Sequence, residues 1–376
     1  MGAEITGTTR RGHQAEGKSS PALLWHGLAT ACLCMGLLAG AGCRSVGPGT
    51  VTRDRLHYTT AMTNSWKEQL LLNIVKSRYG DAPAFLEVVS VVSGYSLETG
   101  VSLGGQFSPE NLRGDTFVSG GLSGKFTDRP TISYAPMAGE NFVRSLMAPV
   151  PLEALMSVIQ GGVPADFILE LTMQSIAGHY NHGMYAGQFQ AADAEFATLL
   201  QLIRALQQAR AMDTEVLKQG ERVEVWLRFH PTEPSNTVMA GEVARLKALL
   251  GVPAEQNRVR VVVGTLAPEA GVVAMRPRSL LQILQTLGAG VQIPVDSTAT
   301  GSAFPVHPAQ VPSGFTVHSG KEKPDQAFAA VPYEGLWFWI DRRDLPSKTT
   351  LAAVTILFNF LAGGSKVSPV LTIPTN

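Results

Sequence analysis

All three cysteines of the chain, Cys32, Cys34 and Cys43, lie near its N-terminus. Two fall inside an apolar segment, residues 22–42, and the third follows that segment directly. If the chain is cut before Cys43, one thiol remains, which excludes intramolecular disulfides, thiolate zinc sites and a separate cysteine nucleophile. The 376 residues, 45% of them apolar, suffice for a sizeable core in one large domain or two.

The N-terminal segment has the layout of a secretory signal. Basic residues, among them Arg10 and Arg11, precede the apolar run, and small residues precede Cys43. Residues 37–43 are similar to a lipobox, although Gly40 stands where leucine is usual. We therefore expect a lipid-anchored cysteine at position 43, with each buried methylene of the acyl chains contributing about 0.8 kcal/mol. An uncleaved transmembrane anchor and simple secretion are open alternatives.

These features predict a bacterial envelope protein held on a membrane by lipid. Arg44 follows the cysteine, and the absence of aspartate there favours the outer membrane, with the folded part facing the periplasm. The balance of 30 basic and 30 acidic residues predicts no affinity for nucleic acid. No cofactor or metal is expected, because the sequence lacks a P-loop, a dinucleotide-binding glycine pattern and the common hydrolase motifs.

Hydrophobic periodicity predicts an α+β fold, with an antiparallel β meander packed against helices and a small α/β unit. Helical spacing covers residues 53–78 and returns between residues 139 and 211, including one helix from 164 to 178. Short alternating runs punctuated by glycine lie between residues 85 and 134 and indicate the meander. The α/β unit alternates strands at 223–229 and 258–263 with helices at 238–250 and 279–287.

The expected segments follow from these patterns. They are a signal peptide (1–42), a lipidated tether (43–52), a helix with the β meander and a helical region (53–211), the small α/β unit (212–293), a loop or linker (294–326), and C-terminal strands and a helix that complete the fold (327–376). In the last segment we expect a strand at 335–341, a helix or buried strand at 348–361, and a final strand at 367–374.

Several segments resemble a family of uncharacterised bacterial envelope lipoproteins. They are residues 65–76, 78–83, 128–134, 278–281, 337–341 with Asp344 and 347–348, and 369–374. The resemblance spans most of the chain after Cys43. It implies an envelope location and one shared architecture, and it implies no activity.

The aromatic strand near the C-terminus supplies the candidate binding residues. Strand alternation puts Trp337 and Trp339 on one face and Phe338 on the other, which fits either core packing or a ligand or partner surface. The following Asp-Arg-Arg-Asp sequence fits either acid–base chemistry or a solvated turn. The candidate binding set is Trp337, Trp339, Asp341, Asp344 and Lys348, and no catalytic residue is assigned.

Two other polar groups could bind a metal or a partner. His179 and His182 would share a face if they lay on a helix and could then bind a metal, but the residues around them indicate a helix end or loop with exposed histidines. Lys67 and Glu68 beside Trp66, with Asn73 and Lys76 beyond, fit the solvent face of the first helix. The alternative is that this polar set packs under the sheet or docks a partner.

The expected function is a non-catalytic structural or interaction role in the envelope, with other envelope proteins or an envelope ligand as partners. The rival is an envelope hydrolase that uses dispersed carboxylates or histidines. Convergent carboxylates or histidines in a deep pocket would favour the hydrolase. A broad apolar patch around the tryptophan strand would favour a partner.

Overall fold

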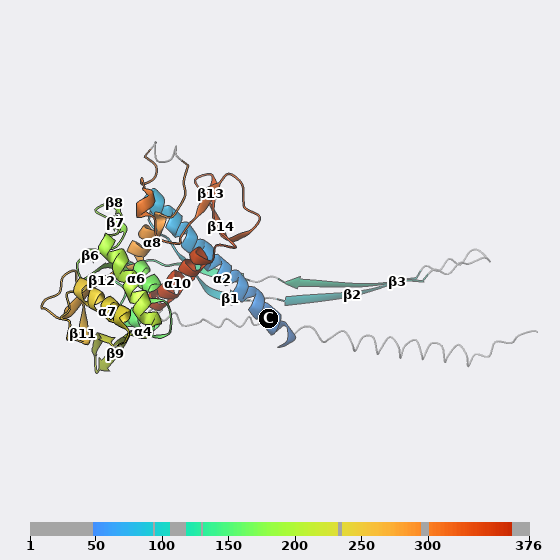
Figure 1. Ribbon diagram of the computed structural model, residues 1–376. Helices are drawn as coiled ribbons and strands as arrows, with labels where there is room; N and C mark the ends of the chain where they lie inside the picture. Colours follow the sequence, from blue (N-terminus) through green and yellow to red (C-terminus); the bar gives the residue numbers. More distant parts are fainter. Residues whose placement is uncertain are drawn as a thin grey trace, which may run out of the picture. The chain divides into compact units, whose positions relative to one another are not determined.

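The computed structural model describes residues 48–92, 95–105, 118–128, 131–231, 235–294 and 301–362 (Figure 1). We call the described residues from Ala61 onward the body. Cys43 and the expected signal peptide lie outside the described residues. The α+β class is confirmed, because helices accompany separate sheets whose strand pairs are mostly antiparallel.

The predicted first helix is α2 (Pro48–Tyr79), which starts at Pro48 rather than at residue 53. Residues 48–52, expected as part of the lipidated tether (43–52), are therefore helical. Proline suits the first turn of a helix because its missing N–H would have no partner there. The helix ends before Gly80, whose φ of 82° is in the left-handed region that glycine tolerates.

The described strands between residues 86 and 136 form two antiparallel pairs rather than the predicted meander. Strand β1 (Leu86–Val92) pairs with β4 (Thr131–Pro136), and β2 (Tyr95–Gly105) pairs with β3 (Val118–Asp128). In a meander β1 would instead pair with β2. Sequence alternation determines which residues share a face of a strand, but it does not determine which strand lies beside it.

A six-stranded sheet lies at the centre of the body, in the order β6-β5-β12-β11-β10-β9. Its strands are β5 (Met173–Ile176), β6 (His179–Tyr180), β9 (Met212–Gln219), β10 (Arg222–Phe229), β11 (Arg258–Val263) and β12 (Val272–Pro277). Strands β11 and β12 are parallel, and the other neighbours are antiparallel. The sequence predicted β10 and β11 and missed β9 and β12. The expected boundary between residues 211 and 212 thus falls within one sheet.

Helices pack on this sheet and on one another. They are α3 (Glu140–Met147), α4 (Leu152–Gln160), α5 (Ala165–Thr172), α6 (Ala194–Gln208), α7 (Thr237–Leu249) and α8 (Leu280–Gly288). Helix α4 contacts β9 and β10, whereas α5 and α7 contact α6. The helix predicted from residue 164 to 178 ends at Thr172 and gives way to β5. All residues of β5 are buried, and so short a buried run has no period that separates strand from helix.

A second sheet, in the order β13-β15-β14, follows in the C-terminal region. Its strands are β13 (His318–Gly320), β14 (Ala327–Tyr333) and β15 (Leu336–Asp341). The segment expected as a loop at 294–326 is largely irregular where it is described, apart from β13 and the 3-10 helix η2 (Pro308–Gln310). Residues 348–361 belong to helix α10 (Leu345–Ala362), and the strand expected at 367–374 lies outside the described residues.

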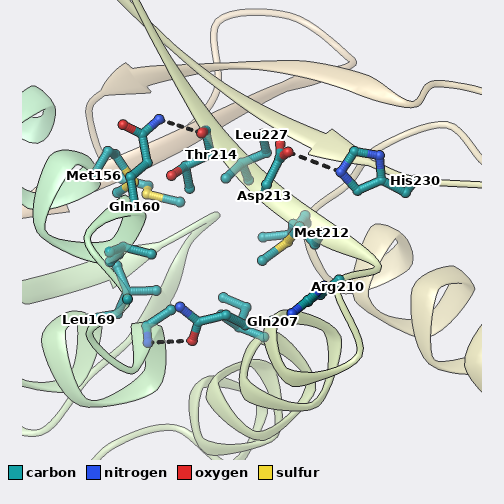
Figure 2. Close-up of a pocket in the computed structure, with 16 residues that line it drawn as sticks. Met156, Gln160, Leu169, Gln207, Arg210, Met212, Asp213, Thr214, Leu227 and His230 are labelled. Carbon is teal, nitrogen blue, oxygen red and sulfur yellow. Dashed lines mark hydrogen bonds and ion pairs between the residues drawn. The ribbon is translucent and has the colours of Figure 1, made fainter.

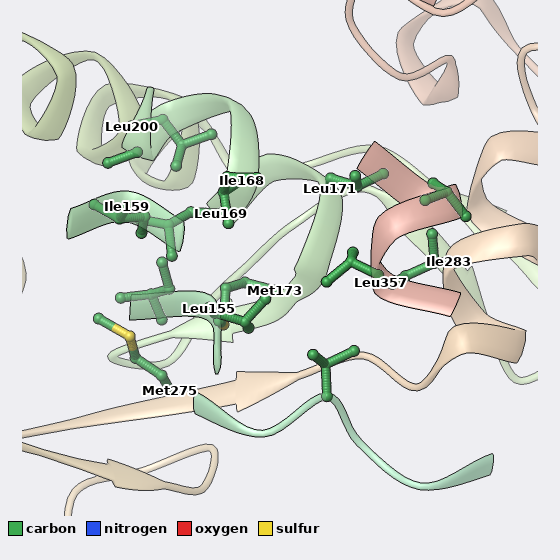
Figure 3. Packing of buried hydrophobic residues seen from close by; sticks show 14 of the residues in the cluster. Leu155, Ile159, Ile168, Leu169, Leu171, Met173, Leu200, Met275, Ile283 and Leu357 are labelled. Carbon is green, nitrogen blue, oxygen red and sulfur yellow. The ribbon is translucent and has the colours of Figure 1, made fainter. Parts of the chain in front are cut away.

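A small hairpin, β7 (Gly183–Tyr185) with β8 (Gln188–Gln190), completes the described strands. The buried apolar side chains of the body form one contiguous core. Figure 3 shows a part of this core, to which α4, α5, β5, β12 and α10 contribute. Fully burying such a side chain stabilises the fold by about 1.5–3 kcal/mol, so the core is the main source of stability. No helix among the described residues combines the length and the apolar composition needed to cross a bilayer.

Candidate functional site

The tryptophans of β15 lie on one face of the strand, as predicted, with Phe338 on the other. Phe338 is fully buried, whereas Trp337 and Trp339 are half-buried. The Nζ atom of Lys323 lies 5.2 Å from a ring centroid of Trp337, and the ring of His318 packs on Trp339 with a centroid distance of 5.7 Å. The two tryptophans therefore form a partly covered aromatic surface, and only Phe338 belongs to the core.

Asp341 and Asp344 each have a local structural partner. The backbone N–H of Arg343 donates to Asp341 at 2.7 Å, and this bond, with the guanidinium of Arg343, lowers the pKa of the Asp341 carboxyl. Asp344 caps α10, because its Oδ1 accepts from the N–H of Ser347 at 3.1 Å and its Oδ2 accepts from the Ser347 hydroxyl at 2.5 Å. These contacts fit a turn followed by a helix start rather than an acid–base pair.

Lys348 and Lys67 lie near the same aromatic ring. Their Nζ atoms are 5.4 Å and 4.5 Å from the ring centroid of Phe328. With Arg342 and Lys323 they line a polar cleft of about 540 Å³, which also contains the carboxylates of Glu68 and Asp325. Lys348 donates to the carbonyl of Arg342 at 3.1 Å, so this candidate residue also supports the turn before α10.

The polar set on α2 is divided between solvent and core. Glu68 is exposed, as the solvent-face interpretation predicted, but Asn73 is fully buried. Its Nδ2 donates to the carbonyl of Ala84 at 2.9 Å, and its Oδ1 accepts from the N–H of Ala84 at 2.8 Å. Asn73 thus satisfies the backbone of the chain that returns after the helix. The aromatic ring of Trp66 packs on Phe358 with a centroid distance of 5.2 Å.

The predicted histidine pair does not form a metal site. The Nε2 of His179 is 3.1 Å from the carbonyl oxygen of Leu249. His182 is buried, which corrects the expectation of two exposed loop histidines, and burial, aided by the charge of Arg278, lowers the pKa of its imidazole to about 3. Within the described ranges, no group of three or more His, Cys, Asp or Glu side chains could hold a metal ion.

Arg278, which begins one of the resembling segments, is a buried structural cation. Its Nη1 donates to the carbonyls of Glu170 and Leu171, both at 2.9 Å, and its Nη2 donates to the carbonyl of His182. Burial lowers the pKa of Arg278 to about 10, which keeps the guanidinium charged near neutral pH. The first two carbonyls belong to the last turn of α5, where the helix dipole favours a cation. Arg278 therefore caps α5 and joins it to the chain near β7.

A cavity of about 750 Å³ lies between helices α4, α5 and α6 and the six-stranded sheet (Figure 2). This volume is within the range of about 300–1,000 Å³ that is typical of small-molecule sites. Most of its lining is apolar. The lining residues are Met156, Ile159, Gln160, Gly162, Ala165, Leu169, Ile203, Gln207, Arg210, Met212, Asp213, Thr214, Leu227, His230, Leu250 and Met275.

The floor of the cavity is buried, and its mouth is exposed to solvent. The apolar lining side chains are buried, and they come from α4, α5, α6 and the strands beneath them. The exposed lining residues are Gln160, Gly162, Arg210 and Asp213. The cavity therefore combines an apolar interior with polar groups at the surface.

Two glutamines hold the walls of the cavity together. The Nε2 of Gln160, at the end of α4, donates to the carbonyl of Thr214 in β9 at 2.5 Å. The Oε1 of Gln207 in α6 accepts from the N–H of Ala165 at 2.8 Å, and its Nε2 donates to the carbonyl of Val163 at 3.1 Å. Figure 2 shows these bonds on opposite sides of the cavity, so each glutamine joins two of its walls.

An aspartate–histidine pair and an arginine lie at the mouth. The Nε2 of His230 is 3.0 Å from the Oδ2 of Asp213, and the side chains are 39% and 53% exposed. Arg210 follows the end of α6, and Figure 2 places it beside Gln207 and Met212. The described residues that line the cavity include no serine or cysteine, and the hydroxyl of Thr214 has no hydrogen-bond partner.

No sequence motif marks the polar residues of this cavity. Asp213 lies in β9, a strand that the periodicity did not reveal, and His230 directly follows β10. Arg210 gives no signal either, because the apolar pattern predicts that the helix continues to residue 211. The predicted binding set lies elsewhere, on strand β15 of the three-stranded sheet and at the start of α10.

Comparison with protein-family models, with curated proteins and with solved structures found no match to this chain. The resemblance to uncharacterised envelope lipoproteins therefore stays a prediction.

Proposed function

We propose that this protein is a lipid-anchored bacterial envelope lipoprotein with a non-catalytic role, and that its body binds an apolar or amphipathic small molecule. The observation that carries the second part is the cavity of about 750 Å³, whose floor consists of buried apolar side chains. Because the hydrophobic effect favours removing apolar ligand surface from water, such a cavity selects apolar groups.

The anchor rests on the sequence around Cys43 and on the residue after it. In this proposal acyl chains on Cys43 hold the protein on the outer membrane, with the body in the periplasm. The Cys43→Ala variant should move from the membrane to the soluble fraction. Mass spectrometry of the N-terminal peptide should find lipid on Cys43, and an unmodified residue 43 or an intact preceding segment would contradict the anchor.

The rival hydrolase would depend on the Asp213–His230 pair, which is the most enzyme-like arrangement in the cavity. A histidine base activates a nucleophile only within hydrogen-bond reach. The hydroxyl of Thr214, the single hydroxyl among the described lining residues, is buried and makes no hydrogen bond. Binding therefore accounts for the cavity better than acyl or glycosyl transfer does.

The cavity is tested with an apolar fluorescent dye and the full chain carrying Cys43→Ala, purified without detergent. We expect saturable dye binding that Ala165→Phe reduces at least tenfold, because Ala165 is buried in the lining and a phenyl ring there fills space. The control is Ala197→Phe on the exposed face of α6. Unchanged binding in a folded Ala165→Phe protein would refute the proposal, with circular dichroism showing that both variants fold.

Contact with other envelope proteins is a second role, favoured by the half-buried Trp337 and Trp339 on an outer strand face. Aromatic residues of this kind are enriched at protein interfaces. Crosslinking in native membranes should capture reproducible partners from the parent protein and fewer from Trp337→Ala. Equal capture from both would place any interface elsewhere.

A further inference from the structure

The residue that follows the C-cap of helix α6 is unusual for its position. Helix α6 ends at Gln208, Ala209 is its C-cap, and Arg210 follows with a φ of 55°, in the left-handed region. The N–H of Arg210 donates to the carbonyl of Gln207 at 3.1 Å, and the N–H of Ala211 donates to the carbonyl of Leu206 at 2.9 Å. These two bonds define a Schellman motif, in which the position of Arg210 is usually glycine. A side chain with a Cβ atom is strained there.

The other left-handed residues of the described chain that are not glycine have a simple explanation. Ala177, Ala186 and Glu334 each precede a left-handed glycine in a two-residue turn between paired strands. This arrangement is the common hairpin turn of antiparallel sheets. Arg210 lies in no such turn: the Schellman motif at the end of α6 holds it in the left-handed region, where glycine would be unstrained. Strained residues of this kind cluster at functional sites.

The guanidinium of Arg210 is available at the mouth of the cavity. The Arg210 side chain makes no hydrogen bond or ion pair with any residue that the structure describes. Arg204, which lies earlier in α6, differs: its Nη1 donates to the Oδ2 of Asp166 at 2.8 Å. The carboxylate of Asp213, another exposed residue of the lining, lies 3.0 Å from the Nε2 of His230. The amide of Gln207 is occupied by the backbone at the start of α5. Arg210 is therefore the lining residue that can take an anion.

We propose that the ligand of the cavity is an anionic amphiphile, with its alkyl chain among the buried apolar side chains and its oxyanion head on Arg210. This inference rests on the proposed function and adds the class of the ligand. A guanidinium binds a carboxylate or a phosphate through two parallel hydrogen bonds, so the head is a fatty-acid carboxylate or an alkyl phosphate. The strain at Arg210 then serves to hold the cation beside the opening.

The test compares three ligands of equal chain length: a long-chain fatty acid, the alkyl phosphate and the alcohol. Calorimetry uses the full chain with Cys43→Ala, and ligand concentrations stay below micelle formation. The parent should bind the better of the two anions about tenfold or more tightly than the alcohol, since hydrogen bonds to charged groups are worth about that much. The anion that binds more tightly, the fatty acid or the alkyl phosphate, identifies the head group.

The matched variants are Arg210→Gln and Arg204→Gln, both on or after the same helix. Arg210→Gln should bind the anion no more tightly than the alcohol, and Arg204→Gln should behave as the parent. Arg210→Gly should also lose the preference for the anion while its thermal unfolding midpoint rises, because glycine relieves the strain.

The outcomes distinguish the two proposals. If the parent binds acid, phosphate and alcohol equally, or if Arg210→Gln keeps the preference for the anion, the ligand class is wrong although the cavity binds. If neither these ligands nor the apolar dye binds, the proposed function fails together with this inference.

Discussion

The two sheets of the body use their polar side chains in different ways. Around the three-stranded sheet, the charged residues that stand out in the sequence serve the local backbone: Asp344 caps α10 and Asp341 holds Arg343. Around the six-stranded sheet, inconspicuous residues such as Arg210 and Asp213 surround a cavity. The conspicuous charges are thus structural, and the candidate site is built from residues that no motif marks.

This difference has a physical origin. A turn and a helix cap need donors and acceptors within a few residues, so they leave a compact charged motif in the sequence. A cavity between helices and a sheet is lined by residues far apart in the chain, and each looks like an ordinary member of its own element.

The largest effect should come from Arg278, the buried cation beside the six-stranded sheet. Arg278→Met leaves the carbonyls of Glu170, Leu171 and His182 without their donor in a buried site. We expect the free energy of unfolding to fall by about 3–5 kcal/mol, because each buried acceptor left without a donor costs about 1–3 kcal/mol. Urea unfolding followed by circular dichroism measures it.

The control for Arg278 is Arg343→Met beside the three-stranded sheet, whose side chain is 88% exposed. Its urea midpoint should match that of the parent, because exposed ion pairs contribute little. Equal decreases in the free energy of unfolding of the two variants would contradict the distinction between a buried structural cation and an exposed ion pair.

The next effect concerns pH and His182. Its pKa is about 3 in the folded protein, because the ring is buried, and the ordinary value is 6.5. Between these values the unfolded chain binds a proton that the folded chain does not, so His182 lowers the free energy of unfolding as pH falls from about 6.5 towards about 3. The slope approaches about 1.4 kcal/mol per pH unit.

The measurement is urea unfolding of the parent and of His182→Gln across this pH range. If the parent has a larger free energy of unfolding than His182→Gln near neutral pH, this difference should shrink as the solution becomes more acidic. A constant difference between the parent and His182→Gln would mean that the imidazole is not buried as described.

The smallest effect lies within the Asp-Arg-Arg-Asp motif. Asp344→Ala removes the cap of α10 and should lower the free energy of unfolding by about 1 kcal/mol. Asp341→Ala should change the unfolding midpoint less, because its bonds are confined to an exposed turn. Thermal unfolding compares the two. If either variant lost ligand binding in the cavity while keeping its stability, the two sheets would form one functional unit.

Much of the fold could be predicted from the sequence because the period of apolar residues is local. Helices α2, α6, α7 and α8 and strands β10, β11 and β15 follow patterns that a helix or a strand imposes on its own side chains. The same reasoning placed Phe338 opposite the two tryptophans. Short buried strands such as β5 were missed because four buried residues carry no period.

The sequence by itself determined where most elements lie, that every cysteine precedes the body, and which residues share a strand face. Only the tertiary structure decided that β1 pairs with β4, that His182 is buried and that Arg210 lies at the mouth of a cavity. The reason is that strand partners, burial and cavities depend on contacts between residues far apart in the chain. Such contacts are set by the packing of the whole core, which leaves no local pattern in the sequence.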